Sequence, residues 1–512
     1  MRSAPAHSPM CAIERLPDRF NAAHWFLRRM VEDGRGDRLA LVCDDERLTY
    51  AELDRRARRV AAALGAAGLR PGDRVAMLLP DSPALSAAFW GTVAAGGVAV
   101  PLYTGLPPRE QRAILHDCAP RFLVYDPTLG RPSAAPGRTL WSVGEMSARC
   151  AATCPAAGYA DTHRDGFAFM LYSSGTTGEP KGVMHRHRDA WVCSTTYAEA
   201  VLGIREDDRC FSVARIPFAY GLGNAQYFPM HAGASAVLFP GRPTPEAVFR
   251  QVRRHRPTLF FGIPTAYARM LAAMEDGAEH DFSSVRLCVS AGEALPAPIF
   301  ERWRERTGIE ILDGIGSTEL CHIFLSNRPG ACRPGSSGTP VPGYRMRIVD
   351  DDGRDLPRGR VGDLLVQGHS AAALYWNNPE ATQRVLGGEW IRTGDKYLVD
   401  EDGYFWHAGR SDDMLRVSGR WVSPVEVEST LLRHEAVLEC AVVGVRDGHG
   451  LVKPCAFVVV RDGARREGLE ADLHALAREH LARYKHPRRI AVVHAIPKTA
   501  TGKMRRFLLR EG

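Results

Sequence analysis

The stretch LYSSGTTGEPKGVMH, Leu171 to His185, places three glycines, four serine or threonine hydroxyls and one lysine in a single loop. Glycine lets the backbone approach a ligand closely, and successive backbone N–H groups form nests that bind anions. The spacing differs from the G-x-x-x-x-G-K-[ST] phosphate loop, because Pro180 stands at its second glycine and Gly182 follows Lys181. The loop therefore predicts a polyphosphate site of another kind, although a Gly/Ser/Thr-rich surface turn would have the same composition.

The segments around this loop alternate short apolar strands with helical patterns. The apolar run FAFMLY precedes the loop, and a helix is predicted around 187–202. Farther out, TYAELDRRARRVAAALGAAG predicts a helix with Thr49 as its N-cap, and strands are predicted at RVAMLLP, RFLVYD, ASAVLF, TLFFGIP, VRLCVSAGE and IEILDGIG. This alternation is typical of mostly parallel sheets covered by helices, which bind ligands in loops at the carboxyl ends of strands. The context favours a functional loop over a simple turn.

The pattern changes after about residue 340. GYRMRIVDDDGRDLPRGRVGDLLVQG and DGYFWHAGRSDDMLRVSGRWVSP indicate short strands joined by D-D-G, P-R-G and D-G turns. From PVEVESTLLRHEAVLECAVVGVRD onward, helices and strands alternate over a length typical of a small domain. We therefore expect a domain boundary near Arg410–Asp413.

Composition excludes several classes of protein. The chain has 512 residues, 45% hydrophobic and 24% charged, as in ordinary globular proteins. The net charge is +7, but the arginine clusters are short and scattered, so we predict no nucleic acid binding. The 12 cysteines form no C-x-x-C pair, which favours a reducing compartment. Because no signal-peptide core and no apolar run of membrane length is found, we expect a cytoplasmic protein without a membrane partner.

Five stretches occur in a fixed order along the chain: SSGTTGEPKGVMH, DGIGSTE (313–319), IRTGDKY (391–397), GRSDDMLRVSGRWVSPVEVE (409–428) and PKTATGK (497–503). Together they resemble the adenylate-forming superfamily of acyl-CoA synthetases, carrier-protein-charging adenylation domains and luciferases. The resemblance covers nearly the whole chain. Two further stretches, FAYGLGN (218–224) and GIGSTELCHIFLSN (314–327), resemble benzoate-CoA ligases and related aryl-CoA ligases. Those enzymes resemble this chain at Ile315, where most of the superfamily has an aromatic residue.

The resemblance implies an α/β fold in two parts. The large N-terminal domain, residues 1–411, would consist of helix-covered sheets plus a β-barrel-like subdomain and would bind ATP and the acyl group. The small α+β C-terminal domain, residues 412–512, would be mobile and carry the catalytic lysine.

Enzymes of this superfamily join a carboxylate to the α-phosphate of ATP, release pyrophosphate and pass the acyl group to a thiol. Because two anions must approach each other, the protein has to supply positive charge, N–H donors and usually Mg²⁺. The resemblance implies that Lys181 and Thr318 lie at the phosphates and that Glu319 holds Mg²⁺; outside its motif, Glu319 would pass for a surface carboxylate. The loop residues implied to bind the phosphates are Ser173, Ser174, Gly175, Thr176, Thr177 and Gly178.

The adenosine side involves carboxylates by the same resemblance. Asp395 would accept hydrogen bonds from the ribose hydroxyls, since a carboxylate accepts two donors at once. Arg410 would contact the ribose side and Asp313 would face the adenine. In isolation an aspartate in RTGDK is more often a turn residue. The other implied ATP-binding residues are Gly292, Glu293, Gly314, Ile315 and Gly316.

The C-terminal part supplies the remaining catalytic predictions. Lys503 in PKTATGK resembles the catalytic lysine of the superfamily, although Lys498 is a near neighbour and a lone C-terminal lysine is usually solvated. A lysine on a mobile domain acts only when that domain is closed over the site. Asp412 resembles the hinge, although a simple turn residue would look the same. After rotation the face containing Gly419 would line the thiol tunnel.

The predicted acyl pocket has small and aromatic residues that suit a flat ring. Ile323 and Ala219 are also compatible with plain core positions, and His322 with either a satisfied core histidine or a polar contact to substrate. The candidate pocket residues are Ala219, Tyr220, Gly292, Gly314, His322 and Ile323.

The predicted function is ATP- and Mg²⁺-dependent activation of an aromatic carboxylic acid to an acyl-adenylate, followed by transfer to CoA. The main alternative is a stand-alone adenylation enzyme that loads the phosphopantetheine of a separate holo-carrier protein. A luciferase-like oxygenase or a non-catalytic binding protein is a third possibility, against which the full set of motif residues speaks. The ring substituents, the thiol acceptor and the oligomeric state are not determined by the sequence.

Overall fold

Two large sheets form the N-terminal body in the computed structural model, which describes residues 13–132, 138–174, 180–417, 420–446, 451–461, 463–498 and 504–510. The first has the strand order β18-β8-β7-β4-β3-β5-β6, and its five strands from β7 to β6 run parallel. Its strands are β3 (Arg74–Leu78), β4 (Val98–Pro101), β5 (Phe122–Tyr125), β6 (Thr139–Ser142), β7 (Phe167–Ser174), β8 (Pro180–Arg186) and β18 (Leu374–Tyr375).

The second sheet has nine strands in the order β15-β14-β13-β12-β11-β9-β10-β1-β2, parallel from β13 to β1 and antiparallel at both edges. Parallel strands need crossover connections, which here are helices. The strands are β1 (Leu39–Cys43), β2 (Glu46–Thr49), β9 (Arg209–Ser212), β10 (Ser235–Leu238), β11 (Leu259–Gly262), β12 (Leu287–Ser290), β13 (Ile311–Gly316), β14 (Ile323–Ser326) and β15 (Thr339–Pro340).

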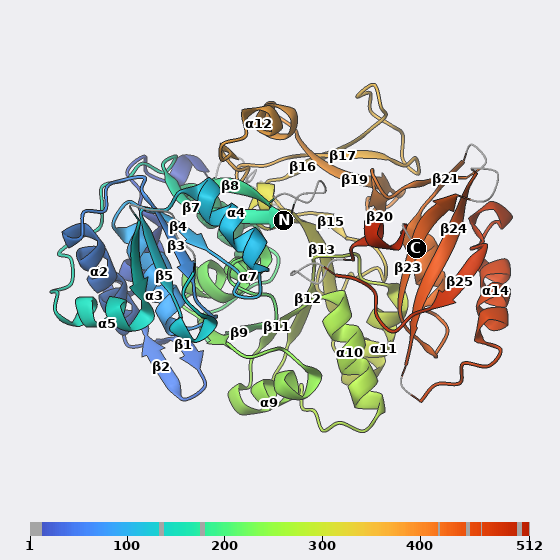
Figure 1. Cartoon of the computed structure of the whole chain (residues 1–512), viewed down its shortest axis with the longest axis horizontal. Helices are drawn as coiled ribbons and strands as arrows, with labels where there is room; N and C mark the ends of the chain where they lie inside the picture. The colour runs from blue at the N-terminus through green and yellow to red at the C-terminus, as the bar shows by residue number, and fades with distance from the viewer. Residues whose placement is uncertain are drawn as a thin grey trace, which may run out of the picture.

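Helices cover these sheets, as the sequence predicted (Figure 1). The helix predicted after Thr49 is α2, and Thr49 and Glu52 form a reciprocal capping box at its start. The helices of the large domain are α1 (Arg29–Glu32), α2 (Tyr50–Ala66), α3 (Pro83–Ala94), α4 (Pro108–Cys118), α5 (Val143–Ala151), α6 (His187–Cys193), α7 (Ala219–Leu222), α8 (Phe228–Ala232), α9 (Pro245–His255), α10 (Pro264–Glu275), α11 (Ala297–Thr307) and α12 (Pro379–Leu386).

The glycine-rich loop connects two antiparallel strands. The sequence predicted the first strand and the helix that begins at His187, but not the strand Pro180–Arg186 between the loop and the helix. Strands β7 and β8 pair in register at Ser173 and Lys181, and α6 begins only after β8. The segment PKGVMHR gave no strand signal because its apolar residues, Val183 and Met184, are adjacent rather than alternating. The loop is therefore the turn of a hairpin whose second strand leads into the helix.

A four-stranded antiparallel sheet, β16-β17-β19-β20, lies in the region predicted as a β-barrel-like subdomain. The D-D-G and D-G turns predicted from sequence separate its strands. The strands are β16 (Arg345–Val349), β17 (Gly362–Gln367), β19 (Ile391–Val399) and β20 (Phe405–Arg410).

The C-terminal part has a core of its own and lies at the right of Figure 1. A three-stranded sheet, β23-β24-β25, packs against two helices, and β23 contacts α10 of the large domain. The elements are β21 (Leu415–Val417), β22 (Arg420–Val422), α13 (Pro424–Leu431), β23 (Val437–Arg446), β24 (Val452–Val460), α14 (Leu469–His480) and β25 (Arg489–Val492). The predicted mixed α/β fold with a large and a small domain is confirmed.

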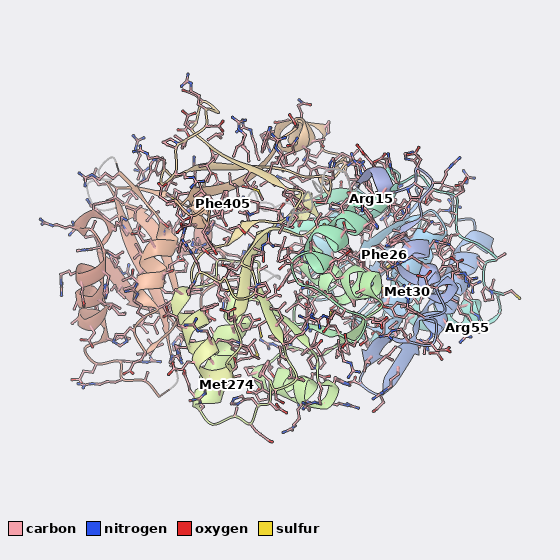
Figure 2. All side chains as sticks on the ribbon, turned by 180° about the vertical axis from the view of Figure 1, so that it is seen from behind. Arg15, Phe26, Met30, Arg55, Met274 and Phe405 are labelled. Carbon is pink, nitrogen blue, oxygen red and sulfur yellow. The ribbon has the colours of Figure 1, made fainter. Side chains whose placement is uncertain are left out.

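Figure 2 labels two arginines and two apolar residues of the N-terminal part of the chain that differ in burial. Arg15 and Arg55 are exposed, whereas Phe26 and Met30 are fully buried. The short arginine clusters thus include solvated helix faces such as that of α2. Within the described part of the chain, no helix has both the length and the apolar character needed to cross a membrane.

Candidate active site

The base of the glycine-rich hairpin lies beside Glu319. The ammonium nitrogen of Lys181 is 5.9 Å from the ring centroid of Tyr375, whose hydroxyl donates to Glu319 Oε1 at 2.7 Å. Strand β18 holds Tyr375 there because it pairs with β8. The structure therefore brings together two predicted phosphate-side residues through a tyrosine that the sequence did not indicate.

Most of the loop lies outside the described residues. The undescribed part is residues 175–179 together with the side chain of Ser174, and it includes the predicted phosphate-binding residues Gly175, Thr176, Thr177 and Gly178. Their predicted contacts with phosphates stay predictions. Ser173 is described, and it pairs with Lys181 across the hairpin.

A buried histidine holds the backbone at Thr318. His185 Nε2 lies 2.8 Å from the carbonyl oxygen of Thr318, and its Nδ1 lies 3.0 Å from Asp189 Oδ2. Neither side chain is exposed to solvent. Because a buried carbonyl needs a donor, His185 fixes the turn that carries Thr318 and Glu319.

The carboxyl ends of β12 and β13 carry Asp313, the predicted adenine-facing residue. Burial raises the pKa of the Asp313 carboxyl to about 8. Its Oδ2 accepts the backbone N–H of Leu295 at 3.2 Å, while its Oδ1 has no hydrogen-bond partner among the described residues. A buried polar atom without a partner is uncommon, so Oδ1 is available to a donor from a ligand.

Glycines near Asp313 differ in what their missing side chains would meet. A Cβ on Gly314 would lie 2.6 Å from the carbonyl oxygen of Leu325, and one on Gly316 would lie 2.5 Å from that of His322. These two glycines, on either side of Ile315, therefore let β14 approach β13. Gly292 instead has φ +98°, and a Cβ there would meet only the side chain of Ile263, at an ordinary contact distance of 3.9 Å, so glycine is needed for the backbone turn after β12.

Glu293 makes a contact that sequence reasoning did not anticipate. Its Oε1 accepts the backbone N–H of Met504 at 2.7 Å, which joins the loop after β12 to the C-terminal segment. Burial raises the pKa of the Glu293 carboxyl, and the N–H of Met504 opposes this rise. The sequence predicted that the backbone around Glu293 flanks the nucleotide. In the structure the side chain of Glu293 forms a hydrogen bond between the two domains.

The predicted ribose-side residues face each other across two strands. Asp395 on β19 is in register with Arg410 on β20, and Arg410 Nη1 donates to Asp395 Oδ1 at 3.1 Å. His407 Nε2 lies 3.6 Å from the same oxygen. The aspartate is thus held in place from two sides, with only 8% of its surface exposed.

Four predicted pocket residues cluster near the start of α7. The rings of Tyr220 and His322 lie 5.5 Å apart, and the Tyr220 hydroxyl donates to the carbonyls of Gly262 and Val289 at 3.2 and 3.3 Å. Ala219 begins the helix. Ile323 begins β14, which pairs with the end of β13. The tyrosine therefore presents its ring, not its hydroxyl, to the surroundings of His322.

Burial lowers the pKa of His322 to about 3, so the ring is neutral. Its Nε2 lies 3.2 Å from two acceptors, the carbonyl of Tyr220 and Oδ1 of Asn224, and therefore carries the hydrogen. Nδ1 is left as an acceptor with no hydrogen-bond partner among the described residues. One ring nitrogen of His322 is therefore hydrogen-bonded within the core, while the other is available to a donor from a substrate. Both roles that the sequence left open, a core histidine and a polar contact, are compatible with this arrangement.

The two C-terminal lysines are distinguished by their partners. Lys498 Nζ lies 2.6 and 2.7 Å from the two carboxylate oxygens of the nearly buried Glu439. Lys498 is therefore a structural ion-pair residue. Lys503 and Gly419 lie outside the described residues. Asp412 lies in the turn between β20 and β21, where its carbonyl accepts from Arg510 at 3.2 Å.

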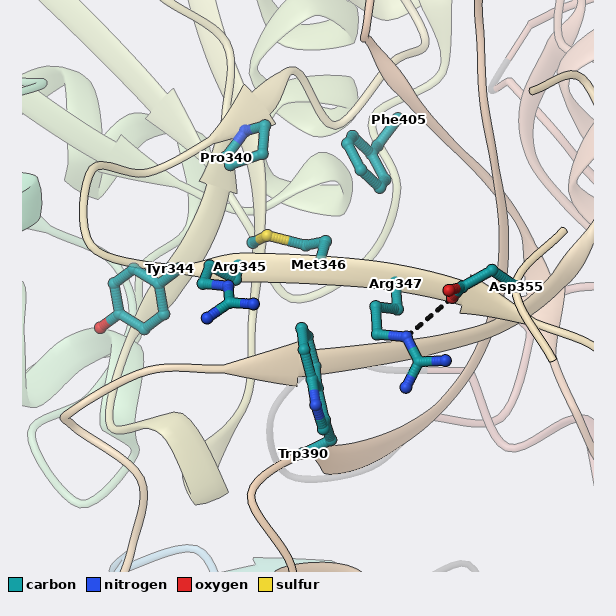
Figure 3. A pocket seen from close by; sticks show the side chains of 8 residues that line it. All are labelled: Pro340, Tyr344, Arg345, Met346, Arg347, Asp355, Trp390 and Phe405. Atoms are coloured by element: carbon teal, nitrogen blue, oxygen red, sulfur yellow. Dashed lines mark hydrogen bonds and ion pairs between the residues drawn. The ribbon is translucent and has the colours of Figure 1, made fainter. Parts of the chain in front are cut away.

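A surface pocket of about 600 Å³ lies elsewhere, on the four-stranded sheet (Figure 3). Arg345 and Arg347 both lie over the ring of Trp390, and Arg347 pairs with Asp355 at 2.7 Å. None of the predicted catalytic or ligand residues lines it, so this pocket is not the candidate site. The lining residues are Pro340, Tyr344, Arg345, Met346, Arg347, Asp355, Trp390 and Phe405.

Sequence reasoning missed Tyr375, His185 and Asp189. Tyr375 and His185 act on residues that lie 56 and 133 positions away along the chain, so no local spacing reveals them. His185 and Asp189 are four residues apart, a spacing that marks a possible pair but not its target. Among the described residues, no group of three or more His, Cys, Asp or Glu side chains could hold a metal.

Comparisons with known proteins agree with this geometry. The model of the AMP-binding enzyme family matches residues 28–376, and that of the AMP-binding enzyme C-terminal domain matches residues 426–503. The chain is 46% identical to the benzoate–CoA ligase of Thauera aromatica, over 99% of each chain. It is 42% identical to the 4-hydroxybenzoate–CoA/benzoate–CoA ligase of Rhodopseudomonas palustris, over 96% of this chain and 94% of that one.

A solved structure shows the same similarity in three dimensions. An anthranilate CoA ligase in complex with anthranoyl-AMP superposes with a TM-score of 0.93 at 43% identity, covering 97% of this chain and 98% of the other. Both the large and the small domain are included in these matches. The chain therefore belongs to the AMP-binding enzyme family.

Proposed function

We propose that this chain is an AMP-forming aryl-CoA ligase that activates benzoate or a substituted benzoate. The observation that carries the proposal is the 46% identity to a benzoate–CoA ligase over 99% of both chains. In the first step a carboxylate oxygen attacks the α-phosphorus of ATP, and the bond to pyrophosphate breaks. In the second step the thiol sulfur of CoA attacks the acyl carbon, AMP leaves, and the thiol proton passes to solvent.

The phosphate side uses the loop base and Glu319. Lys181 supplies positive charge, and Thr318 is held at the phosphates by the His185 contact to its carbonyl. Glu319 fits a magnesium ligand, because its carboxylate is oriented by Tyr375 and Mg²⁺ is usually held by one or two carboxylates plus phosphates and water. A Mg²⁺ ion held by Glu319 would supply positive charge that offsets the charge of the departing pyrophosphate. Ser173 and the loop that follows it donate to the same phosphates.

The adenosine side uses Asp313, Asp395 and Arg410. The unpartnered Oδ1 of Asp313 suits the amino group of adenine, and the oriented carboxylate of Asp395 suits two ribose hydroxyls. The turn at Gly292 and the strand end at Ile315 flank the nucleotide.

The acyl pocket lies between the start of α7 and the start of β14. Tyr220 and the neutral ring of His322 present aromatic surfaces to a flat ring. Ala219 and Ile323 complete the apolar lining, and Gly314 keeps β14 close.

The small domain, residues 412–512, carries the catalytic lysine Lys503 and turns about Asp412 between the two steps. In adenylation Lys503 orients the carboxylate and stabilises the transferring phosphoryl group. In thioester formation the face with Gly419 lines the tunnel for the thiol. The similarity to CoA ligases favours CoA over a carrier protein as the acceptor.

Two assays test the proposal. Purified enzyme with ATP and Mg²⁺ should exchange pyrophosphate in the presence of benzoate or hydroxybenzoates, and only weakly with alkyl acids. Addition of CoA should release AMP at a rate that saturates in CoA. If the adenylate forms but CoA has no effect while a holo-carrier protein becomes acylated, the acceptor is wrong and the adenylation is retained.

A further inference from the structure

The predicted catalytic lysine lies in the segment 499–503, and the two residues that flank this segment, Lys498 and Met504, are paired with each other; we call this pair the base of the lysine segment. Lys498 and Met504 form an antiparallel bridge, and the N–H of Arg505 donates to the carbonyl of Pro497 at 2.8 Å. Lys498 and Met504, which flank residues 499–503 along the chain, are therefore held next to each other. Whatever holds these two residues also holds both ends of residues 499–503.

Each side of this base is tied to a carboxylate. Lys498 pairs with Glu439 on β23 of the small domain, at 2.6 Å. Met504 donates its backbone N–H to Glu293, which belongs to the large domain and follows β12 at the predicted nucleotide site. The first tie lies within the small domain, whereas the second crosses to the large one.

The crossing contact differs from the other polar contacts between the domains. Arg269 on α10 lies 3.7 Å from Glu439, and Arg461 pairs with Glu275 at the end of α10. These pairs join the flank of α10 to the small domain, in the region where α10 stands beside β23 in Figure 1. Only Glu293, among the described residues, reaches the base of the lysine segment directly from the site.

We propose that Glu293 is a positioning residue for adenylate formation: its carboxylate anchors Met504 and thereby sets where the residue covalently before it, Lys503, enters the site. The inference rests on the proposed function, since it assigns Glu293 to one of the two half-reactions. The hydrogen bond between the Glu293 carboxylate and the N–H of Met504 is partly shielded from solvent, and loss of either partner leaves the other without its hydrogen bond. Because the contact joins the two domains, it breaks when the small domain turns away for thioester formation.

Separate assays of adenylate formation and of thioester formation distinguish a positioning role of Glu293 from a general structural role. Glu293→Ala should lower the turnover of carboxylate-dependent pyrophosphate exchange by roughly 10- to 100-fold, the range expected for one lost charge-assisted hydrogen bond. The KM for ATP should stay within about threefold, and CoA-dependent consumption of synthetic benzoyl-adenylate should stay within about twofold. Glu293→Gln keeps an oxygen acceptor and should restore most of the exchange.

A matched control is Glu275→Ala, which removes another carboxylate between the domains without touching the lysine segment. It should change pyrophosphate exchange by less than about threefold, since an ion pair at the surface contributes little. Thermal unfolding of all three variants should match that of the wild-type chain within a few degrees.

Three outcomes overturn the inference. The first is equal loss in both half-reactions for Glu293→Ala, which would make the residue structural. The second is a raised KM for ATP at unchanged turnover, which would place its action on the nucleotide. The third is a Glu275→Ala loss as large as that of Glu293→Ala. If instead the wild-type enzyme makes no aryl-CoA, the proposed function fails, whatever the variants do.

Discussion

The carboxyl ends of β12 and β13 and the base of the lysine segment serve the same predicted reaction but are built differently. Asp313 is held within one continuous sheet, by a backbone N–H of its own domain and by strands packed on both sides. Met504 is held from the large domain by a single hydrogen bond to Glu293. A prebuilt site lowers the cost of ordering on binding, whereas a few polar contacts between domains can be exchanged during a catalytic cycle. The predicted nucleotide site is therefore built within one domain, whereas the contact that holds Met504 depends on how the two domains are placed.

The largest effect is expected from a change in the lysine segment. Lys503→Ala should reduce pyrophosphate exchange by at least about 1,000-fold, because electrostatic stabilisation of the transferring phosphoryl group is lost. Thioester formation from synthetic benzoyl-adenylate and CoA should be nearly unchanged. Lys498→Ala is the control: it breaks the ion pair with Glu439 and should lower the exchange far less. Equal losses in both half-reactions for Lys503→Ala would contradict a lysine used in one state only.

The second effect concerns Asp313 in the predicted nucleotide site and the dependence of the free energy of unfolding on pH. The pKa of Asp313 is raised to about 8, so the native chain holds this proton where the unfolded chain, with an ordinary aspartate, has released it. The stabilisation is complete below about pH 4 and is lost as pH rises through about 8. We expect the free energy of unfolding to fall by at least about 2 kcal/mol over this range through Asp313.

The corresponding measurement is chemical denaturation between pH 5 and 9. Asp313→Asn cannot titrate and should show a shallower fall with pH than the wild-type chain. Parallel pH profiles for the two proteins would mean that Asp313 is charged in the folded state.

The third effect tests the link between the hairpin and Glu319. Tyr375→Phe keeps the ring beside Lys181 but removes the hydroxyl that donates to Glu319. Loss of one hydrogen bond to a charged group corresponds to roughly a tenfold loss in adenylation rate. The apparent affinity for Mg²⁺, measured by metal titration of pyrophosphate exchange, should weaken at the same time. An unchanged metal titration would separate Tyr375 from the metal.

The smallest effect is expected from a change at the start of α2, far from the candidate site along the chain, and it serves as a control for stability. Thr49→Ala removes the side-chain acceptor for the N–H of Glu52 at the start of α2 and should destabilise the fold by about 1 kcal/mol. Both half-reactions should keep their wild-type rates at a temperature well below unfolding. A selective loss of adenylation in this variant would show that the two regions are less independent than their contacts indicate.

Motif order carried more information than any single motif. The loop composition at 173–182 was compatible with a simple turn, and Glu319 with a surface carboxylate, but five ordered stretches pointed to one family, which the comparisons confirm. Strands β3, β5, β10, β11, β12 and β13 follow the apolar runs predicted for them. Strand β8 was missed because adjacent apolar residues, rather than alternating ones, form its buried part.

The sequence by itself determined the family, the α/β architecture and the cap of α2, because these depend on local order: apolar periodicity, turn residues and the succession of motifs. Only the tertiary structure decided that Tyr375 links Lys181 to Glu319, that His185 holds Thr318, and that Lys498 is tied to Glu439. The structure also shows that the side chain of Glu293, which the sequence placed beside the nucleotide, forms a hydrogen bond with the backbone of Met504. The physical reason is that hydrogen bonds form between atoms within about 3 Å, and residues distant along the chain reach that separation only when the sheets and domains have packed.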